Sequence, residues 1–196
     1  MEAPTLDIGP LTLRPLEPED AVGLEPSFND PKLIRLLGLP GPKNAKFLAN
    51  LIRSANADQG ALYMAIEVDE VLSGYTFMDQ IDWGHRHATE TGILVSEPAY
   101  WGRGLGRAAF GRLLMYAFDD LALHRASLGV LEENARAVRS YEALGFRHEG
   151  KRREALLLDT GWEDTLMMGL LEPQLNRIAI AEGIERLEEF IRIRDG

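Results

Sequence analysis

Three glycines that alternate with larger residues form the segment of this chain best suited to chemistry. Gly102, Gly104 and Gly106 are followed at once by apolar residues at helical spacing. Glycine has no Cβ, so its backbone lets a ligand approach closely, and a helix start offers unpaired N–H groups and the positive end of a dipole. We therefore expect an anion site for a phosphate or pyrophosphate, with Arg103 and Arg107 adding positive charge. A glycine motif alone is weak support, because ordinary loops also contain glycines.

The elements that position this segment follow from the apolar patterns around it. A strand leads into the glycines, a helix leaves them, and a second strand and helix follow before a final hairpin. The predicted ranges are strand 88–95, helix 104–121, strand 125–131, helix 134–144 with Gly145 at its C-cap, and strands 146–159 and 162–171.

The first third of the chain is predicted to be less regular. A short strand covers 11–14, and helical or irregular structure fills 18–58. Strands at 61–68 and 71–81 form a hairpin, in which Gly74 marks a bulge or a close approach of backbones. Strands first, then β-α-β-α-β and a hairpin, indicate an α+β or mixed α/β fold.

Residues 1–171 are expected to form one domain, followed by a C-terminal segment at 172–196. Apolar residues recur at helical spacing across 172–194 with charges between them, which predicts an amphipathic helix. We expect this helix to pack on its own domain, or alternatively on a partner subunit in a homodimer.

The composition limits which class of protein this chain can belong to. The 196 residues are 45% hydrophobic and 27% charged, which is ordinary for a globular protein, and include no cysteine, which excludes disulfides and thiolate chemistry. No apolar run is long enough to span a bilayer, and no basic-then-apolar leader opens the chain. We therefore expect a soluble, cytoplasmic protein without a membrane partner.

The net charge of −10 argues against nucleic acid as a partner, since phosphate binding requires a basic face. It suits a cationic substrate through long-range attraction. An acidic surface that only maintains solubility explains the charge equally well.

Several ordered motifs give a more specific indication than the glycines alone. They are GY at 74–75, ETGILVSEPAYWGRGLGRAAF at 90–110, LHR at 123–125, NARAVRSYEALGF at 134–146 and REALLLDTGWEDTLMMGLL at 153–171. From about Gly74 to Leu171 the chain thereby resembles the GNAT superfamily of acyl-CoA-dependent N-acetyltransferases. It is most similar to the RimJ/RimL-like branch, which is related to the ribosomal-protein alanine N-acetyltransferases. Trp101 departs from the Gln or Arg usual in the family, although this branch often has Trp there.

The resemblance implies a fold and a donor substrate. The fold is a central, mostly antiparallel sheet with helices on both faces, in which the parallel strands 88–95 and 125–131 splay apart. Acetyl-CoA would enter between them, its pantetheine along the first strand and its pyrophosphate on backbone N–H groups from Arg103 to Ala108. The implied donor-binding residues are Ile93, Leu94, Val95, Arg103, Gly104, Leu105, Gly106, Arg107, Ala108 and Asn134. Asn134 also suits a helix N-cap, and both roles are compatible.

The resemblance also implies catalytic residues. Tyr141 matches the family's general acid, which protonates the leaving thiolate; a phenol is protonated at neutral pH. Its alternative role is that of a core aromatic. Glu90 matches a Glu of this branch and is the preferred general base, directly or through water; its alternative role is that of a solvated acid at a strand end. Asp82 and Asp164 are weaker choices. Transfer would be direct, with the oxyanion held by a backbone N–H.

Two other functions fit parts of the sequence. Residues 104–109 satisfy GxGxxA, with Glu132 placed as a ribose ligand, which suggests a dinucleotide-binding oxidoreductase. The six residues between strand and first glycine argue against the tight turn that this fingerprint needs. A non-catalytic acyl-CoA-binding domain on the same fold is the stronger alternative. No metal is expected, because the pair His85 and His87 has no third ligand nearby.

The acceptor stays open at this level. A protein N-terminal amine, a polyamine, an aminoglycoside-like amine and a small amino acid all fit, because 18–58 carries no recognisable motif.

Overall fold

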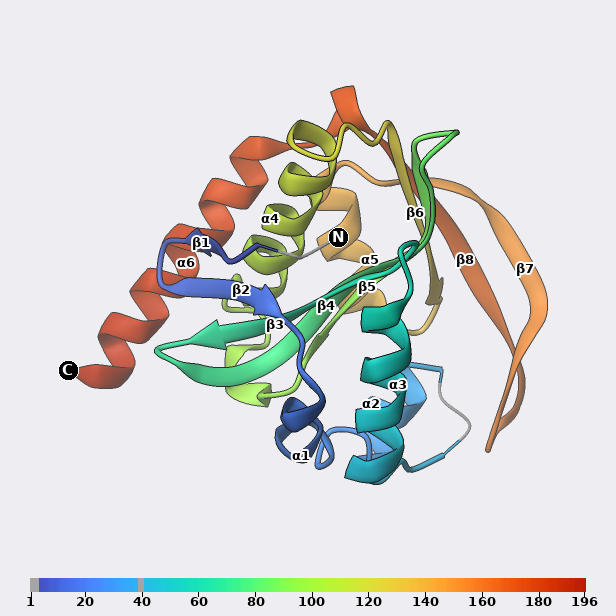
Figure 1. Cartoon of the computed structure of the whole chain (residues 1–196), viewed down its shortest axis with the longest axis horizontal. Coiled ribbons are helices and arrows are strands. Elements are labelled where there is room, and N and C mark those ends of the chain that lie inside the picture. Colours follow the sequence, from blue (N-terminus) through green and yellow to red (C-terminus); the bar gives the residue numbers. More distant parts are fainter. Residues whose placement is uncertain (1–3, 39–40) are drawn as a thin grey trace.

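The computed structural model describes residues 4–38 and 41–196. These residues form one eight-stranded sheet in the order β1-β2-β3-β4-β5-β6-β8-β7 (Figure 1), antiparallel throughout except between β5 and β6. The strands are β1 Leu6–Ile8, β2 Leu11–Pro15, β3 Leu62–Val68, β4 Val71–Asp82, β5 His87–Val95, β6 Arg125–Leu131, β7 Arg147–Leu158 and β8 Gly161–Leu171. The mixed fold with one parallel pair predicted from the sequence is confirmed.

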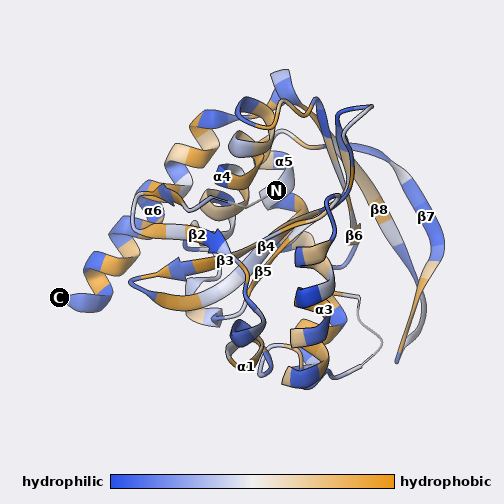
Figure 2. Cartoon of the chain, in the orientation of Figure 1, coloured by the Kyte–Doolittle hydropathy of each residue, from blue (hydrophilic) through white to orange (hydrophobic). Residues whose placement is uncertain are grey.

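Helices cover both faces of this sheet. On one side lie α4 Leu105–Asp119, α5 Ala135–Leu144 and α6 Arg177–Asp195; on the other lie α1 Ala21–Leu24, α2 Pro31–Leu36 and α3 Ala45–Ala57 (Figure 1). Short 3-10 turns are η1 Pro18–Asp20, η2 Pro98–Tyr100 and η3 Glu172–Gln174. In Figure 2, α3 and α6 alternate between hydrophilic and hydrophobic segments, as expected of helices with one buried face. The larger core is centred on Phe110 of α4, and a smaller one lies under α1–α3.

The parallel pair β5 and β6 separates soon after it begins. Only His87 with Arg125 and Ala88 with Ala126 are in register, after which Thr91 Oγ1 donates a 3.0 Å hydrogen bond to the Ser127 carbonyl. Beyond this point β6 pairs only with β8, and β5 only with β4. The predicted splay is therefore present, and it leaves one backbone edge of β5 open.

Gly74 marks both a bulge and a close approach of two backbones, the two roles predicted for it. The pairing of β3 with β4 shifts here, leaving Ser73 without a partner, and Gly74 has a φ of +149°. A Cβ at this position would overlap the carbonyl oxygen of Leu94 on β5. The glycine therefore holds β4 close to the end of β5 that leads to the glycine segment.

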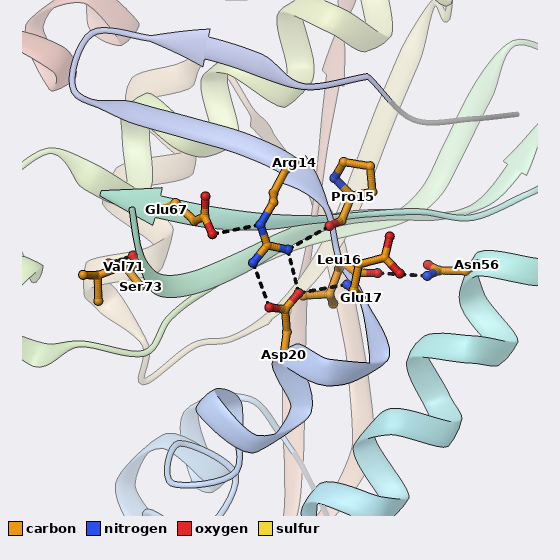
Figure 3. A network of polar contacts seen from close by, with 9 residues as sticks. All are labelled: Arg14, Pro15, Leu16, Glu17, Asp20, Asn56, Glu67, Val71 and Ser73. Atoms are coloured by element: carbon orange, nitrogen blue, oxygen red, sulfur yellow. Dashed lines mark hydrogen bonds and ion pairs between the residues drawn. The ribbon is translucent and has the colours of Figure 1, made fainter. Parts of the chain in front are cut away.

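A polar network fixes the turn from the sheet into α1 (Figure 3). Arg14 donates two 2.8 Å hydrogen bonds to the Asp20 carboxylate and one of 2.8 Å to Glu67. Asn56 of α3 donates a 2.9 Å bond to the Leu16 carbonyl. These bonds tie the start of α1 and the end of α3 to β2 and to the residue that follows it.

One whole strand and the start of one helix differ from the prediction by more than two residues. The strand β1, which pairs with β2, was not predicted, because three residues are too few to show a periodicity. The C-terminal α-helix begins at Arg177 instead of 172, since the Asn176 side chain caps it by accepting a 3.2 Å bond from the Ala179 N–H. No helix in the described part of the chain is long and apolar enough to cross a membrane.

The helix α6 runs antiparallel to α4 and contacts it closely. Arg177 pairs with Asp119 at the end of α4, while Gly183 faces its start at Gly104. Leu187 of α6 is fully buried in the main core. The C-terminal helix thus packs on its own chain, and a homodimer contact through its outer face stays a prediction.

Candidate active site

A cavity of about 510 Å³ passes through the opening between β5 and β6. One end lies at the start of α4, and the other lies against α2 on the opposite face of the sheet. We call these the α4 end and the α2 end. The residues between them are 91–95 of β5, 129–131 of β6 and Tyr141 of α5.

The glycine segment forms the wall of the α4 end. Gly104 is the N-cap of α4 with φ +96°, and the N–H groups of Arg103 and Ala108 are already bonded, to the carbonyls of Tyr100 and Gly104. In the described chain, no acceptor serves the N–H groups of 104–107. These four groups, at the positive end of the helix, are the ones available to an anion.

The donor-binding residues predicted from the sequence fall into two sets. Those that line the cavity are Ile93, Leu94, Val95, Gly104, Gly106, Arg107 and Asn134. Arg103, Leu105 and Ala108 do not. The Arg103 guanidinium lies 5.2 Å from the centre of the Phe190 ring, whereas Leu105 and Ala108 are fully buried, so Leu105 could contribute only its N–H group.

Asn134 and Trp101 also line the cavity. Asn134 Oδ1 accepts a 3.2 Å bond from the Ala137 N–H, so the N-cap role is present together with a place on the cavity wall. Trp101 Nε1 donates a 3.0 Å bond to the Val95 carbonyl, and the Arg136 guanidinium lies 3.8 Å above its ring. Burial lowers the pKa of Arg136.

Tyr141 lies at the middle of the cavity. It packs in the core against Phe110 and Phe146, with ring centres 5.6 and 5.8 Å away, and is only 7% exposed. Its hydroxyl makes no hydrogen bond to the described part of the chain, and burial raises the pKa of Tyr141 to about 12. The phenol is therefore protonated at neutral pH and faces a space where a ligand can receive that proton.

None of the three predicted carboxylates lines the cavity. Glu90 on β5 is paired across the strands with Asp79 and lies 3.7 Å from the Arg152 guanidinium. It comes directly before Thr91, where the cavity wall begins, and it precedes Gly92, on its own face of the strand, by two residues or about 6.6 Å. Glu90 is thus close to the cavity without direct access to it.

The two weaker acids are held in other contacts. Asp82 accepts bonds from the backbone N–H and ring of His85, and these lower the pKa of Asp82 to about 2. Asp164 accepts a 2.8 Å bond from the Glu154 N–H. His85 and His87 stack with ring centres 6.1 Å apart, and no three metal-ligating side chains converge among the residues the structure describes.

The α2 end was not predicted from the sequence. Its wall is apolar and aromatic, made by Leu33, Leu36, Leu37, Tyr75, Phe77 and Leu156. A bulge in β7 places three residues, 153–155, opposite one of β8 and turns Leu156 onto Gly38, just after α2. Burial raises the pKa of Tyr75 to about 12, so this phenol is also neutral.

Arg35 holds α2 in place over this end. Its guanidinium lies 2.6 Å from Glu133 after β6 and 3.1 Å from Glu163 of β8. It also donates a 2.6 Å bond to Thr160 in the turn between β7 and β8. One side chain therefore links α2 to the half of the sheet beyond the splay.

Comparison with known proteins agrees with this geometry. A family model described as an acetyltransferase (GNAT) domain matches residues 10–147, well over half of the chain. The chain belongs to the GNAT acetyltransferase family. It is therefore an N-acetyltransferase, with acetyl-CoA as the acyl donor, and the oxidoreductase interpretation of the glycine motif is wrong. The Glu132 proposed as a ribose ligand instead pairs with Lys151 at 2.6 Å.

Individual relatives cover different parts of the chain. A spermidine N(1)-acetyltransferase of Vibrio cholerae is 33% identical over 116 residues, which are 59% of this chain and 66% of that protein. The match thus spans just under two thirds of that relative. YdaF of Bacillus subtilis, named as a candidate ribosomal N-acetyltransferase, is 30% identical over 171 residues, 83% of this chain and 91% of that one.

A solved structure extends the likeness to three dimensions. The spermidine N-acetyltransferase of Vibrio cholerae in complex with CoA and spermine is similar with a TM-score of 0.77 and 28% identity, covering 84% of this chain and 97% of that one. The finer assignment to the RimJ/RimL-like branch stays a prediction.

Three arginines of the cavity wall were missed from the sequence: Arg136, Arg139 and Arg186. The first two follow Asn134 at spacings of two and five, so their place on the helix after the second splayed strand was a usable signal. Arg186 lies on α6, and nothing in its local sequence indicates a place beside the glycines.

Proposed function

We propose that this protein acetylates the primary amine of a small cationic acceptor of the polyamine type by direct transfer from acetyl-CoA. The observation that carries the proposal is that one continuous cavity joins the start of α4 to Tyr141 and continues to the α2 end. A donor and an acceptor can meet there from opposite faces of the sheet. The spermidine acetyltransferase relatives and the net charge of −10 support a cationic amine.

The proposed donor site uses backbone groups. The pyrophosphate binds the N–H groups of 104–107, and the pantetheine extends along the open edge of β5 at 93–95. The Val95 carbonyl is already used by Trp101, so the remaining groups of this edge carry the pairing.

The proposed chemistry is a single displacement. The neutral amine attacks the thioester carbonyl carbon, a C–N bond forms, and the oxyanion is held by a backbone N–H of β5. The C–S bond then breaks, the Tyr141 hydroxyl gives its proton to the thiolate, and the new amide nitrogen loses a proton. Glu90 accepts that proton through water, because its own side chain is not part of the cavity wall.

The α2 end constrains the acceptor. Its leucines and aromatic rings favour an alkyl chain over a heavily hydrated group next to the reacting amine. The faces of Tyr75 and Phe77 also attract a cation by cation–π interaction. A methylene chain that carries amines at intervals matches both properties.

The test is calorimetry followed by an acceptor panel. Purified protein is titrated with acetyl-CoA, and turnover is measured with spermidine, an aminoglycoside and a peptide that begins with alanine. Turnover of spermidine above the other amines supports the proposal, and preference for the peptide overturns the acceptor class.

Tyr141→Phe separates catalysis from binding. It removes one hydroxyl and keeps the packing against Phe110, so acetyl-CoA affinity should stay unchanged while kcat falls by about 10²-fold or more. Equal turnover in both proteins would contradict the role of Tyr141. Absence of turnover for every amine, with acetyl-CoA still bound, would favour the non-catalytic acyl-CoA-binding alternative.

A further inference from the structure

The last helix of the chain reaches the α4 end of the cavity. It lies beyond the residues 10–147 that the family model matches, yet its Arg186 is part of the cavity wall. A Cβ added to Gly104 would overlap the Gly183 carbonyl oxygen and lie 3.2 Å from the Arg186 Cβ. Because Gly183 also has no side chain, α6 comes close enough to set Arg186 beside the N-cap of α4.

Arg186 differs from the other arginines of α6 that face the domain. Arg177 pairs with Asp119 at 2.6 Å, and Arg194 pairs with Asp69 at 2.7 Å. Within the described chain, no carboxylate lies within ion-pair distance of Arg186. The paired arginines hold the helix against the domain, whereas Arg186 keeps its donors available to a ligand.

The residues around Arg186 are positively charged, although the protein as a whole is negatively charged. Four arginines line the cavity, Arg107, Arg136, Arg139 and Arg186, of which Arg107 and Arg186 lie beside the start of α4. No acidic residue lines the cavity, although the chain as a whole carries a charge of −10. Glu182 of α6 reaches Arg107 at 3.6 Å from outside the wall. Such a local excess of arginine next to free backbone N–H groups is suited to a group with several phosphates.

We propose, on the basis that acetyl-CoA is the donor, that α6 is part of the donor site and that Arg186 binds a phosphate of the coenzyme. The arginine acts on affinity and takes no part in the chemical step. The C-terminal helix thereby couples its own packing on α4 to donor binding, because the same contact of Gly183 with Gly104 places both the helix and the arginine.

The test compares Arg186→Ala with Arg192→Ala. Arg192 lies on the same helix, is exposed and outside the cavity wall, and has no carboxylate partner in the described chain, so it controls for the loss of one charge on α6. Binding of CoA and of 3′-dephospho-CoA is measured by calorimetry at two salt concentrations. We expect Arg186→Ala to weaken CoA binding about tenfold with a smaller salt dependence, while Arg192→Ala binds as wild type. The KM for acetyl-CoA should rise with kcat unchanged, and Arg186→Lys should recover part of the affinity.

The two coenzymes identify the phosphate. If only CoA binding weakens, Arg186 contacts the 3′-phosphate; if both weaken equally, it contacts the pyrophosphate. Unchanged CoA affinity in Arg186→Ala, with a melting temperature equal to wild type, overturns the proposal while leaving acetyl-CoA as donor. A wild-type protein that binds neither coenzyme would instead overturn the donor assignment itself.

Discussion

Replacing Gly104 by alanine should destabilise the fold, because this glycine is required by the contact between two helices. Its φ of +96° lies in the region that residues with a Cβ avoid, and a Cβ would overlap the Gly183 carbonyl oxygen of α6. The sequence suggested that the alternating glycines serve the approach of a ligand. For Gly104 the structure adds a second constraint, imposed by the protein's own backbone.

The loss of stability in Gly104→Ala has two causes, the unfavourable φ and the overlap with α6. A non-glycine residue held at such a φ costs about 1–3 kcal/mol, and relief of the overlap requires α6 to move away from α4. We expect a total loss of about 3 kcal/mol, which for a chain of this length lowers the melting temperature by about 6–12 °C.

Gly106→Ala is the matched control for the same motif. Its added Cβ would meet only Val95 Cγ2, at an ordinary 3.7 Å, and Gly106 lies in the first turn of α4 with no positive φ. Alanine there should leave stability unchanged or raise it by up to about 1 kcal/mol, while its methyl group at the cavity wall weakens CoA binding. Thermal melts of both variants measure stability, and calorimetry measures CoA affinity. Together they separate the structural role of Gly104 from the role of Gly106 in ligand approach. A Gly104→Ala protein as stable as wild type would refute the reasoning.

Three further changes test other parts of the site. Glu90→Gln should lower turnover at pH 7 by about 10- to 100-fold, and the loss should shrink at high pH, where the amine deprotonates unaided; a constant loss at all pH values would contradict the base role. Stability should fall as pH rises from 10 through 12, because the folded protein holds the Tyr141 proton more tightly (pKa about 12) than the unfolded chain does; this one group contributes up to about 3 kcal/mol, and Tyr141→Phe should remove its share from alkaline unfolding curves. Arg35→Ala frees α2 from Glu133 and Glu163, so the KM for the amine should rise while CoA affinity, measured by calorimetry, stays the same; an unchanged KM would show that α2 does not shape the acceptor site.

The sheet could be predicted from the sequence because each strand carries its own signal. Alternating or continuous apolar residues marked seven of the eight strands, and Gly145 marked the end of α5 with the expected φ of +105°. The splay of β5 and β6 came only from the resemblance. Periodicity does not show where two strands stop pairing, and here β6 leaves β5 after two residue pairs while it keeps its pairing with β8 along its whole length.

The site was predictable where its residues lie next to a motif and hidden where they come from distant segments. Asn134 caps α5 and Tyr141 lies within it, and this helix directly follows β6, the second splayed strand. Their order in the sequence therefore already brings both residues to the cavity. The apolar wall of the α2 end depends on a bulge in β7 and on one arginine that links α2 to three other segments, and neither has a local pattern. Glu90 shows the converse case. Its position along β5 was read correctly, but the cavity wall begins with the next residue, Thr91, and does not include Glu90 itself.

The C-terminal helix is a second example of a site contribution that depends on a distant segment. Its apolar stripe predicts that one face is buried, yet the stripe does not say against which helix or in which direction. The antiparallel packing is set by two glycines 79 positions apart, Gly104 and Gly183, each of which lacks the side chain that would keep the helices apart. Once that contact forms, Arg186 comes to lie beside the anion-binding turn, one helical turn after Gly183. An exposed arginine in an acidic helix thus becomes part of the cavity through a contact in which its own side chain takes no part.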